Sequence, residues 1–155
     1  MPVKTEHTEK KPARHKAESV SKEKYIESVG RRKTAVARVR LFSGRQRTAK
    51  TPEVVVNGRP FSEYFPMPNL QKVVLAPFGE LSLKEYHATV KAEGGGLNAQ
   101  AEAIRLGLSR ALVTLNPVWR PKLKSLGFMK RDPRKVERKK YGSRKARRPQ
   151  QWRKR

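Results

Sequence analysis

In the stretch GRRKTAVARVRLFSG (Gly30–Gly44), the apolar residues recur with the period of a β-strand, which is the clearest indication of a sheet in this chain. One face of this strand would carry Ala35, Ala37, Val39 and Leu41. Alternation by two over eight residues gives a strand with one apolar face, which must pack on a core. The opposite face carries Arg38 and Arg40, and the entrance carries Arg31, Arg32 and Lys33. These cations are either solvated side chains of a half-exposed strand or phosphate contacts, and a net charge of +25 favours phosphate contacts.

Two more strands are predicted downstream. EVVVNGRPF (Glu53–Phe61) is a strand that ends in an Asn57-Gly58 turn, and Lys84–Ala92 alternates again. Between them, Ser62–Phe65 suits one helical turn capped by Ser62. The apolar run Leu70–Ala76 fits a helix or a strand equally well.

Helices dominate the second half of the chain. An apolar stripe predicts a helix that begins at Asn98 and ends at Asn116-Pro117. Pro121–Leu126 predicts a short helix ended by Gly127. We expect Leu123, Leu126 and Phe128 to pack back on the sheet. Strands followed by helices indicate an α+β fold, a small mixed sheet with helices on one face.

The glycines Gly94, Gly95 and Gly96 precede the long helix. A glycine-rich loop before a helix can hold phosphate, because the helix amides favour anions. The spacing matches neither nucleotide-binding motif, so a nucleotide-binding enzyme is a weak interpretation. The loop is either a tight connection beside something bulky or a contact for an RNA phosphate.

The last stretch, Lys130–Arg155, holds 14 Lys and Arg against two acids, a net charge of +12. It has no apolar period, so it cannot bury enough surface to offset the ordering cost of roughly 1–2 kcal/mol per residue. We expect it to be disordered alone and to take a shape on a polyanion such as RNA. The alternative is a solvated basic tail or an import signal. Trp152 and Tyr141 lie within it, away from any apolar neighbour, and suit stacking on bases.

Three parts are predicted: a flexible arm over 1–29, a globular RNA-binding body over 30–129, and an extended tail over 130–155, with the folded region starting near Tyr25. Their net charges are +2, +11 and +12. No apolar run approaches the ~20 residues of a membrane span. The arm has no apolar stretch and is rich in Glu, so we expect neither a secretory signal nor a transit peptide.

Catalysis is not indicated. The chain has no cysteine, and His7, His15 and His87 have no second ligand at metal spacing. No carboxylate pair or nucleophile with a base stands out. We expect no cofactor, no metal and no small-molecule substrate.

The motifs together resemble the bacterial type of the ninth protein of the small ribosomal subunit. The matching stretches run in order from Gly30 to Arg155 and include GRRKTAVARVRLFSG, VVNGRPFSEYF, VKAEGGGLNAQAEAIRLGLSRAL, GFMKRDPRKVERKKYGSRKARRPQ and QWRKR. The resemblance implies the fold of the second domain of the fifth small-subunit protein. It also implies a helix around residues 77–83, for which this segment is short.

The resemblance further implies a cytoplasmic, non-catalytic ribosomal protein. Its body would bind the rRNA of the subunit head beside other head proteins, and its tail would reach the anticodon stem-loop of the peptidyl-site tRNA. Lys154 and Arg155, with Arg153 where the family commonly has Ser, would contact that tRNA. The expected rRNA contacts are Arg31, Arg32, Lys33, Arg38, Arg40, Gly94, Gly95, Gly96, Arg131, Arg134, Arg138, Lys139, Lys140, Arg144, Lys145, Arg147, Arg148 and Trp152. The other hypotheses are a free DNA-binding protein and an RNA-processing enzyme built on the glycine loop.

Overall fold

The computed structural model describes residues 24–43, 52–83 and 85–152. Its elements, in chain order, are β1 (Tyr25–Arg32), β2 (Ala35–Phe42), β3 (Glu53–Val56), β4 (Arg59–Pro60), α1 (Phe61–Tyr64), α2 (Pro68–Glu80), β5 (His87–Glu93), α3 (Leu97–Leu115), η1 (Pro117–Trp119), α4 (Arg120–Ser125), β6 (Ser143–Lys145) and β7 (Arg148–Pro149). The predicted arm before residue 24 and the predicted tRNA contacts at residues 153–155 lie outside the described residues.

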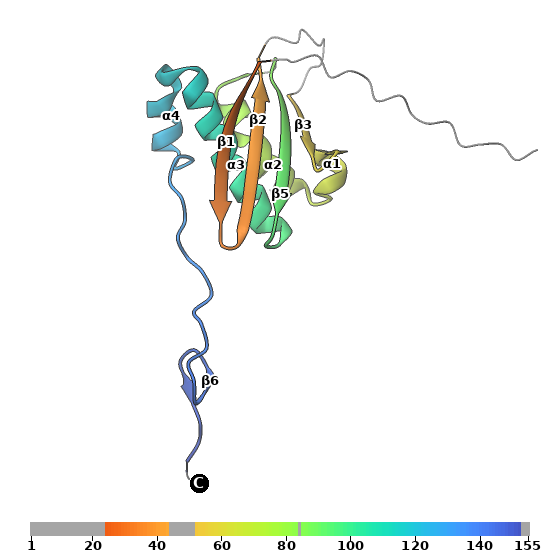
Figure 1. Cartoon of the computed structure of the whole chain (residues 1–155). Helices are drawn as coiled ribbons and strands as arrows, with labels where there is room; N and C mark the ends of the chain where they lie inside the picture. Colours follow the sequence, from red (N-terminus) through yellow and green to blue (C-terminus); the bar gives the residue numbers. More distant parts are fainter. Residues whose placement is uncertain (1–23, 44–51, 84, 153–155) are drawn as a thin grey trace, which may run out of the picture.

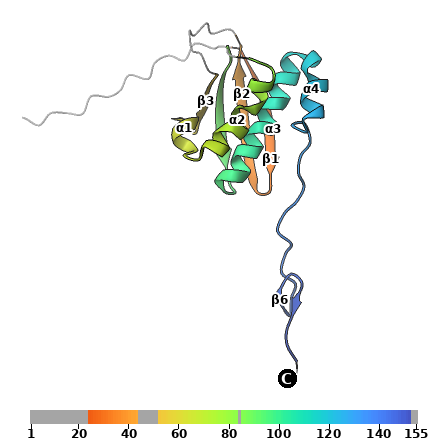
Figure 2. The same ribbon diagram turned by 180° about the vertical axis from the view of Figure 1, so that it is seen from behind.

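One mixed sheet forms the body, with its strands in the order β1-β2-β5-β3-β4. All neighbours are antiparallel except β3 and β5, which run parallel. A parallel pair needs a crossover connection, and here α1 and α2 make it. Helices α2 and α3 cover one face of the sheet, and the other face is open (Figures 1 and 2). The predicted α+β class with helices on one face is confirmed.

The predicted strand is β2, Ala35–Phe42, and the residues before it, through Arg32, belong to a second strand that pairs with it as a hairpin. Strands β1 and β2 pair from Tyr25↔Phe42 to Arg32↔Ala35. A two-residue turn joins them, and Lys33 in it takes a positive φ of 51°. Strand β1 was not predicted, because its sequence YIESVGRR alternates poorly. It begins at Tyr25, near which the folded region was expected to start.

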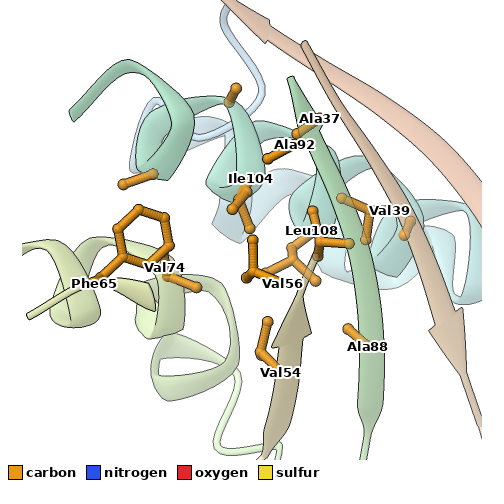
Figure 3. Close-up of a cluster of buried hydrophobic side chains, with 14 of the residues drawn as sticks. Ala37, Val39, Val54, Val56, Phe65, Val74, Ala88, Ala92, Ile104 and Leu108 are labelled. Carbon is orange, nitrogen blue, oxygen red and sulfur yellow. The ribbon is translucent and has the colours of Figure 1, made fainter. Parts of the chain in front are cut away.

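The core lies between the sheet and the two long helices. The predicted apolar face of β2 is buried, with Val39 at 0% exposure, while Arg38 and Arg40 are exposed. In Figure 3, Val56 and Ile104 approach each other across the layers, and Phe65 and Val74 close the end near α1 and α2. The alternation of apolar and polar residues in β2 and β5 therefore correctly indicates which side chains of these strands are buried.

Strand β1 lies directly on α3. The Ser28 hydroxyl donates to the Gly107 carbonyl at 2.7 Å, and Arg110 Nη1 donates to the Val29 carbonyl at 2.7 Å. The strand at this edge of the sheet is thus hydrogen-bonded to the helix through one side chain from each element. The other edge strand, β4, is two residues long and ends in Pro60.

Asn57 and Gly58 form the predicted turn between β3 and β4, with φ values of 50° and 82°. Helix α1 follows, but Ser62 is not its cap. The cap position is Pro60, which has no side-chain hydrogen bond. The cap lies two residues earlier than expected, at a proline whose ring holds φ at −61°.

The ambiguous apolar run belongs to α2, which spans Pro68–Glu80 and buries Leu70, Val74 and Phe78. Pro77 lies within the helix, which ends at Glu80 and is followed by Ser82 at a φ of 54°. The helix implied around 77–83 is therefore the last turn of α2. A proline lacks the amide that bonds four residues back, which hid this helix from sequence inspection.

Helices α3 and α4 end as predicted, at Asn116 and before Gly127. Leu123 is fully buried and Phe128 packs against the core, but Leu126 is 41% exposed. The expectation that Leu126 packs on the sheet was wrong, because it follows α4 at the cap position, facing away from the core.

Candidate nucleic-acid interface

The tail leaves the body beside α4 and runs away from it (Figure 1). Residues 131–140 form no regular element, and β6 and β7 then pair as a small antiparallel unit after Gly142. This pairing was not predicted, because no apolar alternation marks it. Val136, Tyr141 and Trp152 have exposures of 94%, 104% and 90%. The described tail therefore presents its side chains to its surroundings.

The tail's cations fall into two groups. Arg134 is paired with Asp132, and Arg147 Nε lies 2.9 Å from Glu137 Oε2. The second group holds the other predicted basic contacts of the described tail, all of them exposed as Arg134 and Arg147 also are: Arg131, Arg138, Lys139, Lys140, Arg144, Lys145 and Arg148. Like charges along one segment repel one another, so this second group favours an anionic partner.

The three cations at the end of β1 and in the β1–β2 turn, Arg31, Arg32 and Lys33, differ in their exposure. Arg31 and Lys33 are exposed, whereas the Arg32 side chain is only 12% exposed. Alternation along β1 turns Arg32 toward the helix layer, on the side of the buried Gly30. There it contacts Glu102 of α3 through Nε, and its Nη1 lies 2.9 Å from Asp132 Oδ2. Its charge is thus already balanced within the protein.

Arg38 and Arg40 point from the open face of the sheet. They line a hollow of about 750 Å³, together with Lys91, Thr89 and Asn57 among others. Arg40 also stands over the Tyr25 ring, 5.1 Å from its centroid, and Glu27 lies 3.8 Å from Arg40 Nε. Both guanidinium groups are accessible from solution.

The glycine loop is shaped by close packing. Gly94 and Gly95 take φ values of 70° and 65°. A Cβ on Gly94 would lie 2.7 Å from the Thr34 carbonyl oxygen, and one on Gly95 would lie 2.9 Å from the Ala35 Cβ. The loop therefore passes against the β1–β2 hairpin, which supports the interpretation as a tight connection. Gly96 differs: it caps α3 at an ordinary φ of −106° with open space around it.

Electrostatics are most perturbed at Asp132. Hydrogen bonds from the Arg134 side chain and backbone, followed by the charges of Arg134 and Arg32, hold the pKa of Asp132 far below its ordinary value. The same side-chain hydrogen bond raises the pKa of Arg134. Asp132 was not a predicted site residue. The sequence Asp-Pro-Arg did carry a signal, because Asp readily accepts a hydrogen bond from the amide two residues on.

Other sites that could support chemistry are not seen in the described residues. Among residues 24–43, 52–83 and 85–152, no three His, Cys, Asp or Glu side chains gather as metal ligands. Within the same residues, no helix is both long and apolar enough to cross a membrane. His87, the one described histidine, stands 3.5 Å from Glu53.

Comparisons with known proteins agree with one another. A family model described as ribosomal protein S9/S16 matches residues 30–155. A protein named small ribosomal subunit protein uS9 from Trichormus variabilis is 52% identical over 128 residues, which are 81% of this chain and 88% of that one. The protein of the same name from Lawsonia intracellularis is 46% identical over 83% of this chain and 95% of its own length. That from Desulfovibrio desulfuricans is also 46% identical, over 86% and 98%.

Proposed function

Because the chain belongs to the ribosomal protein S9/S16 family, we propose that its body binds the rRNA of the small-subunit head and that its tail reaches the peptidyl-site tRNA. The coarser function follows from the family. The chain is a structural constituent of the small ribosomal subunit, not an enzyme, and its partners are rRNA and other ribosomal proteins. The protein is accordingly located on the ribosome in the cytoplasm.

The observation that carries the finer proposal is the exposed charge of the tail. Nine predicted basic contacts of the described tail stand exposed on a segment that extends away from the body. Such a segment can follow a phosphate backbone between RNA helices, and each phosphate it neutralises releases condensed counterions. The tail therefore suits positioning on RNA backbone more than reading of bases.

The body offers two further surfaces. Arg38 and Arg40 on the open sheet face are accessible from the hollow beside Lys91. Lys33, with Gly95 and Gly96 at the start of α3, borders a second hollow of about 440 Å³. A lysine beside helix amides favours a phosphate group, so this region is proposed to meet rRNA. Arg32 contributes differently, because two carboxylates already balance it.

The tail tip is proposed to contact tRNA through Lys154 and Arg155, assisted by Arg153. Trp152, which precedes the tip, is proposed to stack against rRNA bases. Its high exposure leaves the Trp152 indole free for stacking. Arg153 adds one charge where the resemblance to the family implies a Ser, which would strengthen phosphate contact at the expense of a neutral hydrogen bond.

Removal of Lys154 and Arg155 tests the tip. Small subunits assembled with the shortened chain should hold peptidyl-site tRNA more weakly, while incorporation of the protein into the subunit stays normal. A matched control replaces Lys10 and Lys11 in the predicted arm with Gln, which removes the same charge. If tRNA retention is equal for both variants across several salt concentrations, the tip has no special role.

Sedimentation separates this function from a free DNA-binding protein. The chain should remain with the small subunit through a high-salt sucrose gradient, whereas a free DNA-binding protein would remain at the top. The glycine loop, explained by packing at Gly94 and Gly95, gives an RNA-processing enzyme no support.

A further inference from the structure

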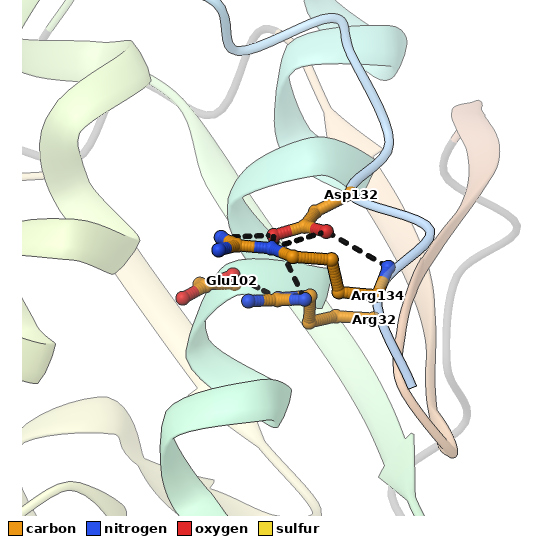
Figure 4. Close-up of polar contacts among 4 residues, drawn as sticks. All are labelled: Arg32, Glu102, Asp132 and Arg134. Atoms are coloured by element: carbon orange, nitrogen blue, oxygen red, sulfur yellow. Dashed lines mark hydrogen bonds and ion pairs between the residues drawn. The ribbon is translucent and has the colours of Figure 1, made fainter. Parts of the chain in front are cut away.

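Four charged side chains meet where the tail leaves the body, and we name them the root cluster: Arg32 of β1, Glu102 of α3, and Asp132 and Arg134 of the tail (Figure 4). Arg32 bridges two carboxylates, contacting Glu102 through Nε and standing 2.9 Å from Asp132 Oδ2 through Nη1. One side chain of the sheet is thus joined both to the helix layer and to the tail.

Asp132 in turn fixes the residues that follow it. The Arg134 backbone amide donates to Asp132 Oδ1 at 2.9 Å. The Arg134 guanidinium donates to both carboxylate oxygens, from Nη2 to Oδ2 at 2.8 Å and from Nε to Oδ1 at 3.1 Å. Pro133, between them, locks its own φ. The Asp-Pro-Arg segment therefore has one defined shape, anchored to the body at its first residue.

Burial distinguishes this cluster from the tail's other ion pair. The side chains of Arg32 and Asp132 are 12% and 26% exposed. Those of Arg147 and Glu137 are 87% and 48% exposed, and both belong to the tail. Charges partly removed from water are screened less by salt, so the first pair is the more persistent. It is also the pair that connects tail to body.

We propose that Asp132 is a positioning residue, which fastens the root of the tail to the body and sets the direction in which the tail leaves before any RNA is bound. The benefit of this anchor for RNA binding rests on the proposed function of the tail, but the anchoring itself does not need RNA. A tail held at its root samples less volume than one hinged at Lys130, and binding then orders fewer residues. Two of the predicted rRNA contacts, Arg32 and Arg134, take part in this anchor.

Spin labels test the anchor in the free, full-length protein. The chain has no cysteine, so Val118→Cys in η1 and Lys135→Cys just past the root give one defined pair of labels. We expect a narrow distance distribution, and Asp132→Asn should replace it with a broad one. Glu137→Gln is the matched control, because it removes one negative charge from the exposed pair and should leave the distribution narrow. Labels at Val118→Cys and Lys72→Cys verify that the body stays folded in each variant.

An equally broad distribution in all variants, or a narrow one in Asp132→Asn, overturns the anchor. Broadening by Glu137→Gln to the same degree also overturns it, because general charge repulsion would then be the cause.

Binding to small-subunit rRNA gives a second readout with opposite signs. Asp132→Asn raises the net charge by one. If net charge alone governs binding, this variant should bind rRNA more tightly; if the anchor matters, it should bind more weakly. Glu137→Gln should bind more tightly. Tighter binding by both variants contradicts the positioning role. If neither protein binds rRNA at all, the proposed function fails, and the label distances still decide the anchor.

Discussion

Gly30 of β1 and Gly107 of α3 lie back to back: a Cβ on Gly30 would stand 2.6 Å from the Gly107 backbone nitrogen. The same Cβ would lie 1.8 Å from the Ala103 carbonyl oxygen, far closer than a carbon and an oxygen can approach without a covalent bond. The strand and the helix can approach this closely only because neither residue has a side chain.

Gly30→Ala should therefore destabilise the body by about 3 kcal/mol or more, because overpacking against backbone cannot be relieved by rotation of a side chain. Urea unfolding measures the change. Gly79→Ala in α2 is the control, since nothing lies within 4 Å of its Cβ position. That substitution should be neutral or stabilising by up to about 1 kcal/mol, as Ala favours helix over Gly. Equal stabilities for the two variants would contradict the close packing.

Asn57 should matter for stability beyond its turn conformation. Its Oδ1 accepts from the Ala92 amide at 2.9 Å, and its Nδ2 donates to the Ala92 carbonyl at 3.0 Å, which continues the pairing of β3 with β5. We expect Asn57→Ala to cost about 2–3 kcal/mol, from the missing hydrogen bonds and a strained φ. Asn57→Asp keeps the acceptor and should cost less. If thermal unfolding ranks Asp below Ala, the amide contacts do not carry this effect.

The acid titration of Asp132 should be displaced downward. Its folded pKa lies below the ordinary 3.8, so its contribution to stability is present above that value and is lost as the pH falls through the lower folded pKa. A carbon-detected NMR titration should find Asp132 still ionised at pH 3.8, the ordinary midpoint of an aspartate side chain. Arg134→Gln should move the Asp132 midpoint back toward 3.8. A midpoint near that value in the unmodified chain would refute the assignment.

Replacing Arg138, Lys139 and Lys140 with Gln should flatten the salt dependence of rRNA binding. The slope of log K against log salt should shrink by about 0.7–0.9 for each phosphate that the variant no longer neutralises. Lys10, Lys11 and Lys16, replaced together, remove the same charge from the predicted arm and should change the slope less. Filter binding at four or more salt concentrations measures both slopes. Identical slopes would mean that the tail acts only through net charge.

Trp152 should report directly on RNA contact. With Trp119→Phe, it is the single tryptophan, and its 90% exposure should give red-shifted emission that acrylamide quenches readily. Stacking on a base should reduce the quenching when rRNA is added. The same single-tryptophan protein without residues 153–155 should behave similarly, because Trp152 precedes the tip. Unchanged quenching in the complex would exclude stacking.

Sequence periodicity located most of the body. The alternation in β2 and β5 and the stripe on α3 identified buried residues such as Val39, Val90 and Ile104, because each element has one apolar face. Strand β1 escaped detection because its buried position is Gly30, which carries no apolar side chain to count. The extent of α2 escaped because a proline such as Pro77 usually ends a helix.

The interface was less readable than the fold. Composition identified the basic residues as a group but could not distinguish Arg32 from Arg31. Arg32 forms ion pairs with Glu102 and Asp132, whereas Arg31 is exposed. Which cations are balanced internally depends on contacts between residues that lie far apart in the chain. No local pattern in the sequence records such contacts.

The two edge strands of the sheet, β1 and β4, affect the tendency of the protein to aggregate at high concentration. An edge strand with free amides and carbonyls is a template on which a second molecule can add its own strand. Here β4 offers two residues, one of them Pro60 with no amide hydrogen, and on β1 the Arg110 guanidinium already occupies the Val29 carbonyl. The β4 edge is therefore a poor template, and the Arg110 contact removes one acceptor from the β1 edge, so both features disfavour aggregation of newly made copies by strand addition.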